Sequence, residues 1–239
     1  MAESIYGKHK EVLPAVLKHL VSQIENYNET KKKETGEPAY EHLIYRIKSE
    51  DSMREKCQRK GLPPVPKSAL YDIHDAIGIR IVCCFLNDIY DNIKFIESIP
   101  GAKVIVGKDY IKSAKPNGYR SFHMILRMDV PFEDVHAENP GQYFAEIQLR
   151  TIAMEFWANL EHQLRYKKDL SPELMEQTSY QLSECARLSA VLDEQMQAIR
   201  DIIEKEEDSS EKSDSPKKPS DRLSRPILSA LENYAPKTE

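Results

Sequence analysis

The stretch AIGIRIVCCF, residues 76–85, is apolar apart from Gly78 and Arg80. A short run of this kind is typical of a strand that is buried within a sheet. Further along the chain, YFAEIQLR at residues 143–150 alternates between two kinds of side chain. Because successive residues of a strand point to opposite faces, this pattern places four residues on one face, three of them polar: Phe144, Glu146, Gln148 and Arg150. The two stretches predict a buried central strand and a second strand with one polar face.

Further strands and helices are expected on both sides of these stretches. Alternation predicts strands over residues 40–48, 102–107 and 121–130. Apolar residues at helical spacing predict helices over 3–33, 88–98, 151–167 and from Pro172 onward, the first interrupted or restarted at Pro14. We therefore expect an α+β fold, a mixed β-sheet flanked by helices, with helical arms at both ends.

Changes in composition suggest where the parts of the chain begin and end. We expect an N-terminal helical arm over residues 1–38, a central domain over 39–168 and a C-terminal helix over 169–207. From residue 208 the chain is dominated by Ser, Lys, Asp, Glu and Pro, which bury too little apolar surface to fold alone. Residues 208–239 are therefore expected to form a disordered tail.

The overall composition excludes several classes of protein. The chain has 239 residues, of which 40% are hydrophobic and 31% charged, which describes a soluble globular protein. Its net charge of −5 argues against a general nucleic-acid binder, which would carry a basic excess. No segment approaches the roughly 18 apolar residues of a membrane span, and the N-terminus lacks the apolar core of a signal peptide. We expect a cytoplasmic protein whose four cysteines are reduced.

Several cations lie on the first expected strand and on the helix after it. Arg46 and Lys48 share one of its faces, and Arg54 and Lys56 follow on a short basic helix. Arginine binds phosphate in a bidentate manner and stacks on flat rings, whereas lysine supplies a compact charge. A solvated basic face is the alternative explanation, and the residues alone favour neither.

A carboxylate stands just before the apolar strand. Asp75 at this edge could hold Mg²⁺, which prefers one or two protein carboxylates together with substrate phosphates, or it could simply be a turn residue. His74 and Asp75 also match the dyad of HD phosphohydrolases. That metal site needs further histidines and an aspartate on helices, so the dyad alone is weak evidence.

A turn, an aromatic ring and several cations lie together in KPNGYRSFH, residues 115–123. Asn117 and Gly118 form a turn signal, because both residues tolerate positive φ. Tyr119 at the edge of this loop could stack on a flat partner, and His123 could donate to a phosphate or ribose oxygen. A lone histidine on a strand is more often structural, but the neighbouring lysines favour a functional role. The pattern suggests a site for nucleotide phosphates.

The motifs resemble, in order, the synthetase domain of RelA/SpoT proteins. The matching segments are YRIKS (45–49), DAIGIR (75–80), KDYI (108–111), KPNGYRSFH (115–123), EIQLRT (146–151) and FWANLEHQLRYK (156–167). The short chain and its helical arms look like a small alarmone synthetase, more similar to the RelP-type branch than to the RelQ-type. The resemblance implies a nucleotidyltransferase-like fold and the transfer of pyrophosphate from ATP to the 3′-hydroxyl of GTP or GDP, giving pppGpp or ppGpp and AMP.

The resemblance also implies roles for individual residues. ATP would be bound, with Arg46 stacking on adenine, by Arg46, Lys48, Arg54, Lys56 and Arg80. GTP or GDP would be bound, with Tyr119 stacking on guanine, by Lys108, Lys115, Asn117, Tyr119, Ser121, His123 and Gln148. Asp75 and Glu146 would be the catalytic carboxylates and would hold Mg²⁺. Glu146 could instead deprotonate the 3′-hydroxyl, and the sequence leaves these two roles open.

The family further suggests a homotetramer and binding of pppGpp between subunits in some relatives. Glu155 stands on a helix where its charge would repel a phosphate-rich ligand, so we expect weak or absent activation by pppGpp. Three alternatives to a synthetase remain: a nucleotide sensor without turnover, an RNA-binding regulator that uses the basic clusters, and an HD-type hydrolase.

Overall fold

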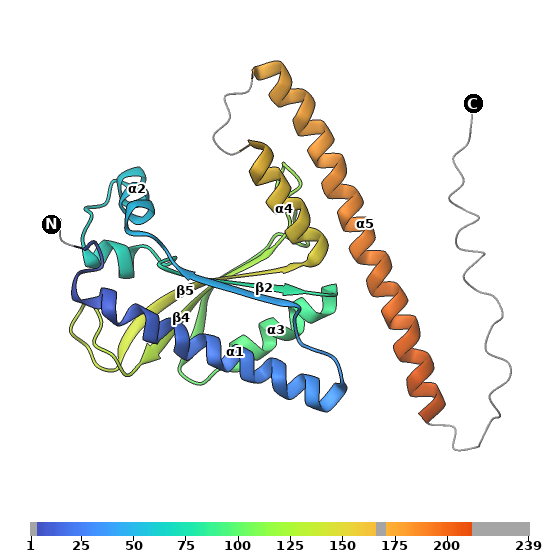
Figure 1. Cartoon of the computed structure of the whole chain (residues 1–239), viewed down its shortest axis with the longest axis horizontal. Helices are drawn as coiled ribbons and strands as arrows, with labels where there is room; N and C mark the ends of the chain where they lie inside the picture. The colour runs from blue at the N-terminus through green and yellow to red at the C-terminus, as the bar shows by residue number, and fades with distance from the viewer. Residues whose placement is uncertain (1–3, 166–170, 212–239) are drawn as a thin grey trace. The chain divides into compact units, whose positions relative to one another are not determined.

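A five-stranded mixed sheet forms the centre of the protein, in a computed structural model that describes residues 4–165 and 171–211 (Figure 1). Across the sheet the strands lie in the order β1 (His42–Ile47), β2 (Ile77–Cys83), β5 (Gly141–Thr151), β4 (Phe122–Val130) and β3 (Ala102–Asp109). The β2 and β5 strands are parallel, and the other neighbouring pairs are antiparallel. The apolar stretch that predicts a buried strand is β2, which has a neighbour on each side.

Helices lie on both sides of this sheet. They are α1 (Leu13–Thr35), α2 (Glu50–Lys60), α3 (Leu86–Ser98), α4 (Ile152–Arg165) and α5 (Pro172–Glu211), with short helical turns η1 (Gly7–Glu11) and η2 (Ser68–Asp72). In Figure 1, α1 and α3 lie on one side of the sheet and α4 lies on the other. The expected α+β fold, a mixed sheet flanked by helices, is confirmed.

The two faces of the sheet differ in chemistry because its strands alternate as expected. One face is buried against α1 and α3 and is apolar; its central members are Ile79, Ile81, Met124, Ile147 and Leu149. The other face carries partly exposed polar side chains: Arg80, His123, Glu146 and Gln148. We call this second side the open face. It is the surface on which a ligand can meet charged groups.

Both ends of the described chain are helical. Pro14 stands in the first turn of α1, where its missing N–H costs nothing, and Leu20 and Ile24 of this helix belong to the main core. Helix α1 is thus part of the central unit, which extends to Ile199. At the other end α5 continues to Glu211, past residue 208 where the tail was expected to begin. The rest of the expected tail, 212–239, lies outside the described residues.

None of the helices in the described ranges is both long enough and apolar enough to cross a membrane.

We predict that Ile147→Ala lowers the free energy of unfolding by about 2–5 kcal/mol, because a fully buried side chain leaves a cavity at the centre of the sheet. Urea denaturation measures this difference. The matched control is Ile105→Ala on the edge strand β3, where the side chain is 38% exposed and the expected loss is less than about 1 kcal/mol. Equal losses for the two variants would contradict the assignment of the core face.

Candidate active site

Two rows of residues cross the open face, each from one strand to the next. In the first row Arg46 on β1, Gly78 on β2 and Glu146 on β5 are register partners. The second row continues across more of the sheet, through Arg80, Gln148, His123 and Lys108. Partners in register project to the same face, so the structure brings these predicted residues together. The central strand β5 separates an arginine-bearing side, β1 and β2, from a side with His123 and Lys108.

A small hollow lies on the arginine-bearing side. Its volume is about 110 Å³, and Arg46 and Arg80 line it together with Glu146 and Gln148. Gly78 is also part of the lining, and a Cβ atom added there would come no closer than 3.9 Å to the Arg46 side chain. The open space above Gly78, between two guanidinium-bearing side chains, suits a flat ring with attached phosphates.

Asp75 joins two of the predicted cations. Its Oδ2 accepts hydrogen bonds from Lys48 Nζ at 2.7 Å and Lys56 Nζ at 2.5 Å. Lys56 is brought there by α2, whose first turn is capped by the Ser49 hydroxyl accepting from the Ser52 backbone N–H. Burial alone would raise the pKa of Asp75, but the hydrogen bonds from the two lysines outweigh it and lower the pKa below its usual value. Asp75 is therefore an anion at neutral pH.

One carboxylate oxygen of Asp75 fits the predicted Mg²⁺ site. Asp75 Oδ1 is buried and has no hydrogen-bond partner among the described residues, which leaves a carboxylate oxygen available to a cation. No group of three or more His, Cys, Asp or Glu side chains within residues 4–165 and 171–211 could hold a metal. A site made of Asp75 and Glu146 would therefore depend on substrate phosphates for its remaining ligands, as Mg²⁺ sites commonly do.

Glu155 on α4 bridges two arginines of the open face. Its Oε1 accepts from Arg80 Nη1 at 2.9 Å, and its Oε2 accepts from Arg150 Nη1 at 2.7 Å. Burial would raise the pKa of Glu155, but the charges of Arg150 and Arg80 lower it overall. The expectation of weak pppGpp activation rested on Glu155 as an unbalanced charge. The structure removes that reason, because two arginines neutralise the carboxylate in place.

Arg150 lies at the site but was not among the predicted site residues. This side chain is only 5% exposed, and its Nη2 donates to the Tyr119 hydroxyl at 2.6 Å and to Gln148 Oε1 at 3.2 Å. The signal was present in the sequence, because Arg150 shares the strand face of Glu146 and Gln148. Arg150 also contacts Glu155 on α4 and Tyr119 in the loop before β4. Alternation along one strand does not predict contacts with other segments of the chain.

Tyr119 and His123 are directly connected. The Tyr119 hydroxyl lies 2.8 Å from His123 Nε2, and the Lys115 ammonium lies 4.8 Å from the centre of the Tyr119 ring. Burial, followed by the positive charges of Arg150 and Lys115, lowers the pKa of His123 to about 4. His123 is therefore neutral at pH 7. Its imidazole has one donor and one acceptor nitrogen, and with Nδ1 lying 3.8 Å from Glu146 Oε1 it faces the carboxylate of the central strand.

The remaining predicted residues make contacts within the protein. Asn117 accepts from the Tyr119 backbone N–H, which fixes the predicted turn. Arg54 pairs with Glu50 within α2, at 3.9 Å. Ser121 is fully buried and its hydroxyl donates to the Leu149 carbonyl, so in this arrangement it holds β4 to β5 and does not face the open side.

The open face gathers cations and carboxylates on one side of a mixed sheet. The chain belongs to the RelA/SpoT family, because the model of the region found in RelA / SpoT proteins matches residues 45–171. The resemblance recognised from the sequence motifs is confirmed.

Individual relatives agree with this assignment. The chain is 39% identical, over 170 residues, to GTP pyrophosphokinase YwaC of Bacillus subtilis (strain 168), an alignment that covers 71% of this chain and 78% of the relative. The crystal structure of small alarmone synthetase 2 from Bacillus subtilis is similar with a TM-score of 0.64 and 35% identity, covering 78% of this chain and 96% of that one. Small alarmone synthetase 1 from the same organism, bound to its product pppGpp, gives a TM-score of 0.67 at 28% identity, covering 80% and 93%.

We predict that His123 remains neutral from about pH 8 down to about pH 5, since its pKa is lowered to about 4 while an unfolded histidine has a pKa of about 6.5. A proton NMR titration should show its ring signal unmoved over that range. The chain has seven histidines, and the ring signal that is missing from the spectrum of His123→Asn is the signal of His123. Between about pH 6.5 and 4 the unfolded chain takes up this proton first, so the stability contributed by neutral His123 is lost as the pH falls. A titration midpoint near 6.5 would contradict the burial of this ring.

Proposed function

We propose that this protein is a GTP pyrophosphokinase. It transfers the β,γ-pyrophosphate of ATP to the 3′-hydroxyl of GTP or GDP and releases pppGpp or ppGpp and AMP, as part of the stringent response. The observation that carries the proposal is the place of Glu146 on the central strand, between arginines on one side and His123 with Lys108 on the other. The names of the relatives, GTP pyrophosphokinase and small alarmone synthetase, agree with it.

ATP binds on the side of β1 and β2 in this proposal. The hollow between Arg46 and Arg80 receives the adenine, and Gly78 leaves space for the ring to lie flat. Lys48 and Lys56 then neutralise the phosphates, since both ammonium groups are gathered around Asp75. Arg54 adds a cation on the same helix, α2.

The acceptor nucleotide binds on the side of β3 and β4. Tyr119 stacks on guanine, and Lys108, Lys115 and His123 contact its ribose and phosphates. Support for this side comes from the loop itself: Lys115 and Tyr119 are already in contact, and the Asn117 turn orders the backbone between them. Gln148, which donates to Glu146 Oε2 at 3.4 Å, stands between the two nucleotides.

The reaction is an in-line displacement at the β-phosphorus of ATP. The bond from the acceptor 3′-oxygen to the β-phosphorus forms, and the bond from the β-phosphorus to the oxygen bridging the α-phosphorus breaks, so AMP leaves. Such transfers depend mainly on positioning and on charge neutralisation, which the open face supplies through its cations. Glu146 accepts the proton of the 3′-hydroxyl or shares with Asp75 in holding Mg²⁺. When bound, Mg²⁺ would add charge neutralisation at the phosphates.

The protein acts as a cytoplasmic homotetramer in this proposal. Apolar side chains on α4 and α5 support subunit contacts, because they line a groove of about 540 Å³: Ile152, Phe156, Leu188, Leu192 and Met196. All five of these side chains are exposed. Light scattering that gave the mass of one chain would contradict the tetramer.

The reaction itself is tested by incubating the protein with GTP, Mg²⁺ and labelled ATP. A label on the γ-phosphate of ATP should appear in pppGpp, and a label on the α-phosphate should appear in AMP. Glu146→Gln should lower kcat by more than about tenfold, a rise of more than ~1.4 kcal/mol in the barrier. Glu138→Gln, the same change at an exposed loop position, is the control. Binding of both nucleotides without release of AMP would instead support the sensor that lacks turnover.

We also predict that Gly78→Ala raises the KM for ATP at least about fivefold, equivalent to ~1 kcal/mol, because the added methyl group projects into the hollow between Arg46 and Arg80. The KM for GTP should stay within about twofold. Gly107→Ala is the control, since its Cβ would make only ordinary contact with Phe122 at 3.6 Å on the core face. Steady-state kinetics with each nucleotide varied in turn would refute the ATP assignment if both KM values rose together.

A further inference from the structure

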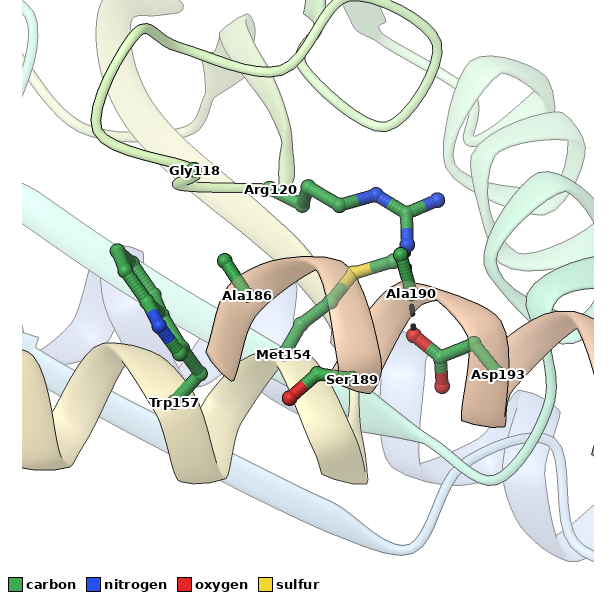
Figure 2. A pocket seen from close by; sticks show the side chains of 8 residues that line it. All are labelled: Gly118, Arg120, Met154, Trp157, Ala186, Ser189, Ala190 and Asp193. Atoms are coloured by element: carbon green, nitrogen blue, oxygen red, sulfur yellow. Dashed lines mark ion pairs between the residues drawn. The ribbon is translucent and has the colours of Figure 1, made fainter. Parts of the chain in front are cut away.

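The loop that carries Lys115, Asn117 and Tyr119 rests on helix α5. This loop joins β3 to β4, and Figure 2 shows two of its residues, Gly118 and Arg120, facing the α5 residues Ala186 and Asp193. Trp157 of α4 lies beside the same contact. We call residues 110–121 the acceptor loop. Its backbone closes on itself through the Tyr110 N–H to Ser121 carbonyl hydrogen bond of 3.0 Å.

The contact at Gly118 leaves no room for a side chain. Its φ is +89°, and a Cβ atom added there would lie 2.4 Å from the Ala186 Cβ, well inside contact distance. The same atom would lie 3.8 Å from the Trp157 ring. The turn therefore requires glycine on both conformational and steric grounds, and it also requires a small residue on α5. A larger side chain at Ala186 would push the loop away from the helix.

A charged contact fixes the end of the same loop. Arg120 Nη1 lies 3.9 Å from Asp193 Oδ2, and Arg120 Nε donates to the Ile111 carbonyl at 3.4 Å. Asp193 also accepts from the Thr151 hydroxyl at 2.9 Å, at the end of the central strand. Arg120 thus spans both ends of the loop, and Asp193 connects it to β5. Burial raises the pKa of Asp193, against the opposing effects of Thr151 and Arg120.

Aromatic packing completes the contact. Trp157 and Ala186 form a small buried cluster against which Tyr119 and Leu182 pack. The Trp157 indole N–H donates to the Leu182 carbonyl of α5 at 2.8 Å. Tyr119, which is proposed to stack on guanine, therefore packs against α4 and α5. Its hydroxyl hydrogen-bonds with Arg150 and His123 on the sheet.

We propose that α5 positions the acceptor loop, and that Asp193 and Ala186 are positioning residues which set the affinity for the guanine nucleotide without touching it. The inference rests on the proposed function, because it names the nucleotide that the loop receives. It goes beyond the family match, which ends at residue 171, whereas α5 begins at Pro172. The alternative is that these contacts only stabilise the fold, in which case both nucleotides would be affected alike.

The test uses Asp193→Asn and Ala186→Leu in the whole chain of 239 residues. Asparagine keeps an acceptor for Thr151 but removes the charge that faces Arg120, and leucine displaces Gly118. Each variant should raise the KM for GTP about three- to tenfold, the effect of losing roughly one net interaction, and leave the KM for ATP and kcat within about twofold. The matched controls are Glu194→Gln and Ala198→Leu, exposed positions on the same helix that should behave as the original protein.

A second measurement does not depend on activity. Trp157 is the only tryptophan in the chain, so tryptophan fluorescence, excited at wavelengths that tyrosine does not absorb, reports on the surroundings of this one side chain. Both variants should shift its emission to longer wavelength and increase quenching by acrylamide, with far-UV circular dichroism unchanged. The isosteric Asp193→Asn remains informative if Ala186→Leu does not fold.

The possible results separate this inference from the proposed function. If the original protein makes no pppGpp, the proposed function fails, while fluorescence and calorimetric binding of GTP still test the loop contact. If the original protein is active and the variants change neither the fluorescence nor the KM for GTP, the role of α5 is overturned. An equal rise in the KM for ATP and GTP would overturn it as well, because that result indicates general destabilisation.

Discussion

The site depends on two carboxylates that each hold two cations in place. Lys48 and Lys56 lie close together, and so do Arg80 and Arg150. Repulsion between the like charges of each pair would disfavour this arrangement. Asp75 relieves this for the two lysines, and Glu155 relieves it for the two arginines. The cations are therefore ordered before any ligand arrives, so less entropy is lost when a nucleotide binds to them.

The sheet was largely predictable because it obeys a local rule. Alternation in residues 143–150 correctly separated Glu146 and Gln148 from the core residues, and the apolar run at 76–85 was correctly assigned to an interior strand. Register, in contrast, is set by pairing between distant segments. The sequence therefore predicted that Arg46, Gly78 and Glu146 lie on strands, but not that they form one row.

The contacts that the sequence did not predict have a common physical origin. Glu155 was interpreted from its charge alone, and its meaning changed once Arg80 and Arg150 were found on either side. Ser121 was assigned by its place in a motif, yet its hydroxyl is used by the backbone of β5. On α5 the apolar spacing predicted a helix, but it did not predict that Asp193 and Gln197 are buried and Leu192 is exposed. Each outcome depends on a tertiary partner, which periodicity does not contain.

The parallel pairing of β2 with β5 has a consequence for how the enzyme is made. Gly78 and Glu146 are adjacent in the sheet but far apart in sequence, so their pairing closes a long loop and costs more chain entropy than a local contact does. A nascent chain that ends before β5 already carries Arg46 and Asp75 but has neither Glu146 nor the strand that joins the two sides. Such a chain therefore lacks the row that Arg46, Gly78 and Glu146 form in the complete sheet.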